Sequence, residues 1–310
     1  MKISIVVPCF NEEEALPIFF KETEKIKQIV SHEFEYIFIN DGSKDRTLDS
    51  MRELAQKYPY VRYISFSRNF GKESALYAGL QASTGDLVTV MDVDLQDPPE
   101  LLPEMIQLLE NSDIDCVGTR RSTREGEPVV RSFFARMFYK LINKISDTEM
   151  VDGARDFRLM TRQMVDSILE LSEYNRFSKG LFSWVGYKTE YISFENRERS
   201  AGKTSWSFWS LFNYSLDGII NFSDAPLTFA SYIGAFSCLG ALIALIFIVV
   251  RAILFGDPTS GWPSLVSIVL FIGGLQLLCL GIIGKYIGKI FLETKKRPIY
   301  IVKETEKTRK

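Results

Sequence analysis

The chain has 310 residues, room for one large domain or two smaller ones, and a formal net charge of −2. A charge this close to zero gives no sign of nucleic-acid binding, and the single histidine, His32, argues against multi-histidine metal sites and Ser-His-Asp triads. Four scattered cysteines without a C-x-x-C pair are typical of buried thiols in a reducing compartment. Acid–base and metal chemistry therefore fall to carboxylates.

Apolar runs alternate with helical patterns over the first 118 residues. Strands are predicted at 3–7, 34–39, 61–66, 87–91 and 114–118, and helices at 11–30, 45–57, 72–82 and 98–109. Asn11 is the expected N-cap of the first helix, with Glu14 completing a capping box. Strands separated by such helices predict βαβ units, an α/β fold and a mostly parallel sheet.

Polar residues stand where the first four predicted strands end. They are Pro8, Asn11 and Glu12, then 41–43, then 67–72, and finally Asp92 and Asp94. Each group alone is compatible with ordinary turn chemistry. Right-handed crossovers bring parallel strand ends to one edge, where open α/β sheets bind ligands. Neither a G-x-G-x-x-G fingerprint nor a P-loop is present, so a different kind of nucleotide site is indicated.

The segment DLVTVMDVDLQDPP at 86–99 is the most informative of these. Asp92 and Asp94 lie two residues apart on an extended segment, so their carboxylates point the same way. Such a pair can hold a hard divalent cation, which in turn can hold a diphosphate. A D-x-D pair by itself is more often an acidic turn; the surrounding segments favour the metal site.

Five segments carry a resemblance to a known family: VVPCFNEE, NDGSKDRT, SRNFGKESAL, DVDLQDPPE and GARDFRLM. In this order and spacing they resemble the family 2 glycosyltransferases with the Rossmann-like GT-A fold. More narrowly, the chain is similar to the polyprenyl-phosphate glycosyltransferases, which include bacterial undecaprenyl-phosphate glucosyltransferases and dolichyl-phosphate mannose synthases. The motifs cover residues 1–225, and the hydrophobic architecture covers the rest.

The resemblance implies a role for each matching position on the donor side. Pro8, Asn11 and Glu12 would lie along the nucleotide, Asp41 would bind the base or ribose, and Lys72 or Arg68 would lie near the donor. Asp92 and Asp94 would bind Mg²⁺ or Mn²⁺, Asp94 being a catalytic residue, with Gln96 alongside. A divalent ion would offset the negative charge that grows on the departing nucleoside diphosphate.

On the acceptor side the resemblance implies that Asp156 is a catalytic base or an orienting carboxylate. A lipid phosphate is already largely ionised near neutral pH, which favours orientation. Arg120, Arg131, Arg199 and Lys203 are the expected ligands of the acceptor phosphate, although the lysine of the family pattern is displaced here. Spacing alone also allows an Arg-flanked structural carboxylate and solvated charged loops.

Two stretches without Asp, Glu, Lys or Arg, 225–250 and 258–284, exceed the roughly 20 residues that cross a bilayer. The connection around Gly256-Asp257-Pro258 has no Lys or Arg, and Arg251 lies near the outer end of the first stretch, whereas Lys285, Lys289 and Lys295 follow the second stretch. The positive-inside rule therefore places the catalytic domain in the cytoplasm. Aromatic residues at helical spacing over 207–222 favour an interfacial amphipathic helix over a core helix.

The expected organisation is a cytoplasmic GT-A domain at 1–205, an interfacial helix at 206–224, transmembrane helices at 225–255 and 258–288, and a basic cytoplasmic tail at 289–310. The expected activity is inverting transfer of one hexosyl unit from UDP-glucose or UDP-GlcNAc to undecaprenyl phosphate at the cytoplasmic membrane face. A GDP-mannose-dependent synthase, a processive polysaccharide synthase (although no Q-x-x-R-W motif occurs) and a non-catalytic membrane scaffold remain alternatives. The resemblance also implies a homo-oligomer, a tetramer.

Overall fold

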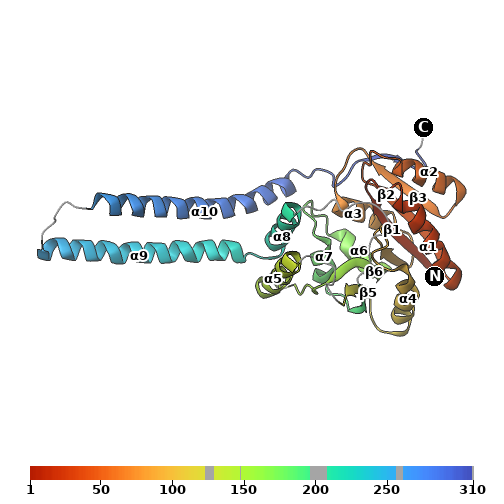
Figure 1. Ribbon diagram of the computed structural model, residues 1–310, viewed down its shortest axis with the longest axis horizontal. Coiled ribbons are helices and arrows are strands. Elements are labelled where there is room, and N and C mark those ends of the chain that lie inside the picture. Colours follow the sequence, from red (N-terminus) through yellow and green to blue (C-terminus); the bar gives the residue numbers. More distant parts are fainter. Residues whose placement is uncertain (123–128, 147, 196–207, 256–260, 309–310) are drawn as a thin grey trace.

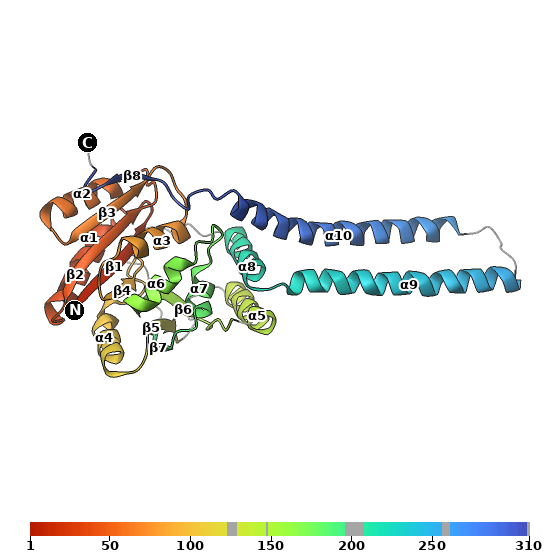
Figure 2. The same ribbon diagram turned by 180° about the vertical axis from the view of Figure 1, so that it is seen from behind.

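The computed structural model describes residues 1–122, 129–146, 148–195, 208–255 and 261–308. An α/β domain carries two long helices that project from it side by side (Figure 1). The view from behind shows the same arrangement, with the carboxyl-terminal segment returning to the α/β domain (Figure 2).

Within the described residues, eight strands form one sheet in the order β7-β5-β6-β4-β1-β2-β3-β8. They are β1 (Lys2–Cys9), β2 (Glu33–Asn40), β3 (Val61–Phe66), β4 (Leu87–Val90), β5 (Cys116–Arg121), β6 (Ala154–Thr161), β7 (Thr189–Phe194) and β8 (Val302–Thr305). The first four strands are parallel, which confirms the predicted mostly parallel α/β fold. Strand β6 runs antiparallel to β4 and β5, and β8 runs antiparallel to β3.

Helices cover both faces of this sheet. They are α1 (Ala15–Ile29), α2 (Thr47–Lys57), α3 (Lys72–Ala82), the 3₁₀ turn η1 (Pro99–Leu101), α4 (Leu102–Asn111), α5 (Val129–Ile145), α6 (Arg162–Glu170) and α7 (Ser178–Trp184). Residues Ile3 and Ile5 of β1 pack in the cluster formed with α1, α2 and α4, whereas Val6 packs with α3 and α6. Because neighbouring side chains of a strand point to opposite faces, a strand covered on both faces is apolar throughout.

The start of the first helix differs from the prediction. Helix α1 begins at Ala15 with Glu14 at its N-cap position, so Asn11 is not the cap. Asn11 has a left-handed backbone (φ 56°), and its side-chain oxygen accepts a hydrogen bond from the Lys44 amide at 2.8 Å. Asparagine tolerates this conformation because its short polar side chain bonds locally. Its side chain ties the β1 loop to the β2 loop instead of capping a helix.

Two helices are long and apolar enough to cross a membrane. After α8 (Phe208–Phe222) come α9 (Ala225–Phe255) and α10 (Trp262–Thr294), with candidate spans at Ala225–Ala244 and Ile268–Thr294. Almost nothing in these spans is buried by the rest of the chain. An exposed apolar surface of this length is unfavourable in water and is matched by a bilayer core.

The carboxyl-terminal segment is more structured than the predicted basic tail at 289–310. Helix α10 continues to Thr294, and 302–305 then form β8 on the edge of β3. The Glu304 carboxylate accepts two hydrogen bonds from Arg52, at 2.6 and 2.8 Å, and one from the Tyr63 hydroxyl at 2.6 Å. The last strand therefore covers a sheet edge that would otherwise expose unpaired backbone groups.

Candidate active site

A lysine and two aspartates meet at the carboxyl edge of the parallel strands. The Lys72 ammonium lies 2.6 Å from Asp92 Oδ1 and 2.6 Å from Asp156 Oδ2. Lys72 opens α3, Asp92 follows β4, and Asp156 lies on β6. Val90 of β4 pairs with Arg158 of β6, so the antiparallel register brings Asp156 beside the segment that holds Asp92.

The charges in this cluster fix its protonation. Burial raises the pKa of Asp156, but the positive charges of Lys72 and Lys179 outweigh it and hold that pKa well below the usual range. Burial lowers the pKa of Lys72, and the carboxylates of Asp156 and Asp92 outweigh it in the opposite direction. Both groups are therefore ionised at neutral pH, and Asp156 is a weak proton acceptor.

A second ion pair fixes the acidic loop to β6. Arg155 Nε lies 2.6 Å from Asp97 Oδ1, and Asp97 is only 1% exposed. Burial raises the pKa of Asp97, an effect that the Arg155 charge opposes. This pair holds the turn after Asp94 against the strand that carries Asp156. Its sequence signal is the alternation of Arg and Asp in GARDFRLM.

Asp41 organises the loop that leads into α3. Its two carboxylate oxygens accept hydrogen bonds from the amides of Phe70 and Gly71, at 2.6 and 2.9 Å. Gly71 has φ +96°, a conformation that side-chain-bearing residues rarely adopt, and Lys72 follows directly. Asp41 therefore positions Lys72 through the backbone. Each of its oxygens keeps a further lone pair that can accept a hydrogen bond from a ligand. The contact of Asp41 with a base or ribose stays a prediction.

The other predicted nucleotide residues lie on the adjacent β1 loop. Pro8 is part of β1, and the amides of Asn11 and Glu12 donate hydrogen bonds to the hydroxyls of Ser43 and Thr47, at 3.0 and 2.8 Å. The loops after β1 and β2 are thereby held together at the same sheet edge as Lys72. Their contact with a nucleotide stays a prediction.

Asp92 and Asp94 suit a hard divalent cation in their chemistry. Asp94 is 5% exposed, and the Gln96 amide donates to its Oδ1 at 3.1 Å. Among the described residues, no group of three or more His, Cys, Asp or Glu side chains gathers in a way that could enclose a metal. Mg²⁺ is often bound by one or two carboxylates together with substrate phosphates. The pair therefore fits an ion whose remaining ligands come from a diphosphate and water.

The predicted acceptor-phosphate residues are only partly described. Arg120 lies near the carboxyl end of β5, and its Nε donates a hydrogen bond to the Ser193 hydroxyl at 2.9 Å. Arg131 falls on α5, but its side chain is outside the described part of the structure, and so are residues Arg199 and Lys203. Among the contacts that the structure describes, those of Arg120 do not include Asp156.

Lys179 is a cation that sequence reasoning missed. It acts on Asp156 electrostatically and lies on α7, far from Lys72 in the chain. The preceding Ser178 donates hydrogen bonds to the Glu73 carboxylate from its amide, at 2.9 Å, and from its hydroxyl. Lys72 and Lys179 thus act on the same aspartate while their neighbours Glu73 and Ser178 are hydrogen-bonded to each other, and no local motif predicts this.

Comparison with known proteins identifies the family. The profile described as "Glycosyl transferase family 2" matches residues 4–169. A "Prophage bactoprenol glucosyl transferase homolog" of Escherichia coli (strain K12) is 45% identical over 99% of this chain and 100% of its own length. The "Bactoprenol glucosyl transferase" of Shigella phage SfX is 45% identical over 98% of this chain and 99% of its own.

A solved structure of glucosyl-3-phosphoglycerate synthase from Mycobacterium tuberculosis, in complex with Mn²⁺, UDP-glucose and phosphoglyceric acid, is similar with a TM-score of 0.47. It is 20% identical and covers 71% of this chain and 77% of its own. The family assignment rests on the profile, which spans more than half of the chain, and on relatives that align over nearly all of it. The chain belongs to glycosyl transferase family 2.

Proposed function

We propose that this glycosyltransferase moves one glucosyl unit from UDP-glucose to undecaprenyl phosphate, with inversion, at the cytoplasmic face of the membrane. The observation that carries the proposal is the Lys72 cluster with its neighbouring D-x-D pair, on a domain attached to two exposed apolar helices. The bactoprenol glucosyl transferases that align over nearly the whole chain support the choice of glucose and of a polyprenyl acceptor.

In the proposed reaction, a phosphate oxygen of the lipid attacks the anomeric carbon of the sugar. The bond from that carbon to the diphosphate breaks, and UDP leaves with the electron pair. Asp92 and Asp94 would hold Mg²⁺ or Mn²⁺, which when bound offsets the charge that develops on the diphosphate. Attack opposite the leaving group inverts the configuration at the anomeric carbon.

Asp156 acts in this scheme as an orienting carboxylate. A phosphate monoester has a second pKa of about 6, so the acceptor is already a nucleophile at neutral pH and needs no strong base. Asp156 has a lowered pKa and is paired with Lys72, which makes it poorly suited to remove a proton. It holds the Lys72 ammonium in place, and that positive charge screens the approach of two anionic substrates.

The membrane attachment matches the solubility of the two substrates. Moving a polyprenyl chain into water costs about 0.8 kcal/mol for each CH₂ group, so the lipid stays in the bilayer while the nucleotide sugar stays in water. Helix α5 exposes Phe134, Met137 and Leu141, by 43%, 49% and 44%. These residues are spaced to lie on one helix face, so α5 is suited to rest on the membrane surface beside α8.

The test uses full-length protein in liposomes with undecaprenyl phosphate and labelled UDP-glucose, UDP-GlcNAc or GDP-mannose. We expect labelled lipid from UDP-glucose, with one sugar on each lipid, and its loss in Asp94→Ala. The control Asp113→Ala removes an exposed carboxylate and should keep full activity. Transfer from GDP-mannose or formation of polymer would support another enzyme, and no transfer from any donor would support a scaffold.

A further inference from the structure

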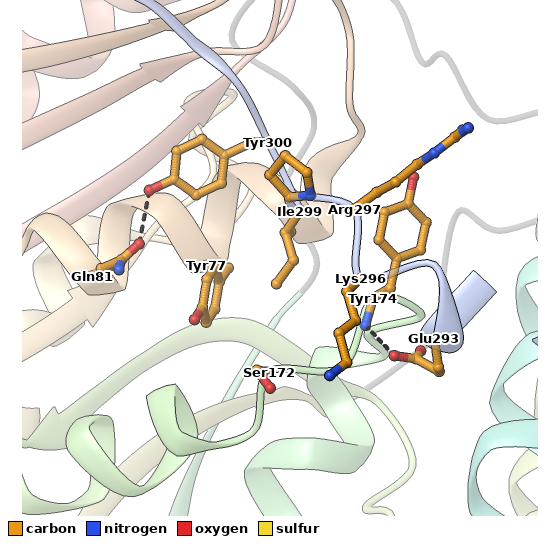
Figure 3. Close-up of a pocket in the computed structure, with 10 residues that line it drawn as sticks. Tyr77, Gln81, Ser172, Tyr174, Glu293, Lys296, Arg297, Ile299 and Tyr300 are labelled. Carbon is orange, nitrogen blue, oxygen red and sulfur yellow. Dashed lines mark hydrogen bonds between the residues drawn. The ribbon is translucent and has the colours of Figure 1, made fainter. Parts of the chain in front are cut away.

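A pocket lies where α10 ends and the chain turns back toward β8 (Figure 3). It has a volume of about 690 Å³ and is lined by α3, by the loop between α6 and α7, and by the segment 293–300. Its lining includes Tyr77, Tyr174, Glu293, Lys296, Arg297 and Tyr300. We call it the α10 pocket. Its size is in the range of sites that hold a small molecule or a lipid head group.

The α10 pocket lies at the end of a candidate membrane span. That span closes at Thr294, and Lys296 and Arg297 follow within one turn. With α10 in the bilayer, this level is that of the head groups, where lysine and arginine meet lipid phosphates and tyrosine rings are favoured. Three of the lining residues are tyrosines.

The backbone directs Lys296 into the pocket at the cost of strain. Lys296 has φ +46°, a left-handed conformation that is usually taken by glycine where it occurs at the end of a helix. In Figure 3 its ammonium points down toward Ser172, whereas Arg297 extends outward from the rim. A strained residue whose charged group faces a cavity is a reason to look for a ligand there.

Within the described structure, no ion pair neutralises the positive charge of Lys296. Neither Lys296 nor Arg297 forms a side-chain hydrogen bond or ion pair with any residue that the structure describes. The nearby Glu293 carboxylate instead accepts from the amides of Tyr174 and Asn175, at 3.0 Å each, and from the Asn175 side chain at 3.1 Å. Among the residues that line the pocket, two cations therefore accompany a single carboxylate, which already accepts these hydrogen bonds.

The α10 pocket is separate from the reacting edge of the sheet. Tyr77 and Gln81 follow Lys72 on α3 by five and nine residues, which places them about 8 and 14 Å further along the helix axis. A phosphate held beside them is out of reach of a sugar carbon at the Lys72 cluster. The pocket is therefore distinct from the site where the acceptor phosphate reacts.

We propose that the α10 pocket binds the head group of an anionic phospholipid of the cytoplasmic leaflet. Lys296 contacts the phosphate, Arg297 adds charge at the rim, and the tyrosine rings pack against the glycerol region. The bound lipid holds the segment between α10 and β8 against α3. This inference goes beyond sugar transfer and rests only on α10 crossing the membrane.

The test measures thermal unfolding and native mass spectra of the full chain in detergent, with dioctanoyl phosphatidylglycerol or dioctanoyl phosphatidylcholine. We expect phosphatidylglycerol to bind and to raise the unfolding midpoint, and Lys296→Gln to weaken that binding about tenfold. Lys295→Gln is the matched control, because Lys295 lies over the Phe291 ring at 3.9 Å and does not line the pocket. Its binding should equal that of the unmodified chain.

Two further variants separate lipid binding from folding. Lys296→Gly relieves the left-handed strain, so it should unfold at a higher temperature without lipid and still bind phosphatidylglycerol weakly. Ser172→Trp fills the pocket but keeps both cations, and it should also lose binding. Equal losses in the Lys295 and Lys296 variants, or equal binding of both lipids, would refute a head-group site.

Two more measurements decide which lipid is bound and keep this proposal apart from the catalytic one. Displacement of phosphatidylglycerol by undecaprenyl phosphate would overturn the proposal by assigning the pocket to the acceptor. Sugar transfer by Lys296→Gln, measured in detergent with undecaprenyl phosphate but without phospholipid, should match the unmodified chain. If neither the unmodified chain nor any variant transfers sugar, the proposed function is wrong, but the lipid-binding results are unaffected.

Discussion

At the amino edge of the parallel strands, Glu35 of β2 is 3% exposed and accepts hydrogen bonds from the Thr84 amide and the Lys2 ammonium, each at 2.7 Å from a carboxylate oxygen. At the carboxyl edge, Asp92 and Asp156 share the Lys72 ammonium, and Asp94 lies nearby. Both edges place carboxylates beside a lysine, fully buried at the amino edge and half-buried at the carboxyl edge. The amino edge is saturated by its own donors, whereas the carboxyl edge lies where open α/β sheets bind ligands.

The difference teaches how a buried charge is to be interpreted. Burial raises the pKa of Glu35, but Lys2, Ser4 and Thr84 outweigh it and lower that pKa to about 2. The pKa of Asp156 at the carboxyl edge is held low as well, so a lowered pKa does not by itself separate a structural carboxylate from one at a ligand site. What separates them is their place in the sheet, because the carboxyl edge is where parallel strands open a crevice for ligands such as a cation and a diphosphate. The predictions below test this contrast.

The largest effect is expected from Lys72→Gln. Without the ammonium, Asp92 and Asp156 repel each other and the two anionic substrates lose their screen, so we expect sugar transfer to fall about 10³-fold, or ~4 kcal/mol. The measurement is labelled lipid formed from UDP-glucose, with the surface variant Lys57→Gln as control. Because Lys72 and Asp156 act together, the double variant with Asp156→Asn should be hardly slower than either single one. Multiplied losses would show independent roles.

Removal of divalent metal should come next. We expect exhaustive treatment with EDTA to lower sugar transfer about 100-fold and Mg²⁺ or Mn²⁺ to restore it, because Asp92 and Asp94 would hold the ion against the diphosphate. The thermal midpoint of the substrate-free chain should hardly change. Full activity in the metal-free enzyme would refute a catalytic ion.

At the saturated edge, Glu35→Gln should reduce stability by about 2–3 kcal/mol, roughly 5–10 °C in thermal midpoint, while each folded molecule keeps its activity. The folded pKa of about 2 lies below the reference value of 4.5, so this stabilisation is present above pH 4.5 and is lost as pH falls toward 2. The midpoints of variant and unmodified chain should therefore converge in acid. The exposed Glu33→Gln is the control, and a gap that persists at pH 2 would contradict the ionic explanation.

The smallest effect is expected from Glu304→Ala on β8. It removes the paired hydrogen bonds with Arg52 and the one from Tyr63, which should cost about 1–2 kcal/mol of stability. Sugar transfer per folded molecule should not change, since β8 lies at the far edge of the sheet from β6. The exposed Lys303→Ala is the matched control in the same strand, and an equal loss there would deny Glu304 a specific role.

Much of this arrangement follows from local pattern, and the rest does not. The parallel strands and the polar residues after them were predictable because apolar runs alternate with helices. Strand β6 was missed because ARDFRLMT mixes charged and apolar residues, and its partners β4 and β5 lie earlier in the chain. The pairing of β8 with β3 and the approach of Lys179 to Asp156 join distant segments, which no local motif encodes.

The return of the chain after α10 has a consequence for catalysis. The polypeptide leaves the α/β domain at Ser223, whose carbonyl accepts from Tyr286 of α10 at 2.7 Å, and it rejoins that domain at Tyr300, which stacks on Phe66. Two separate connections restrict rocking and rotation of the catalytic head above the bilayer more than one linker would. In the proposed reaction the crevice would then keep a fixed height above the bilayer, and lateral diffusion would bring each carrier lipid to it.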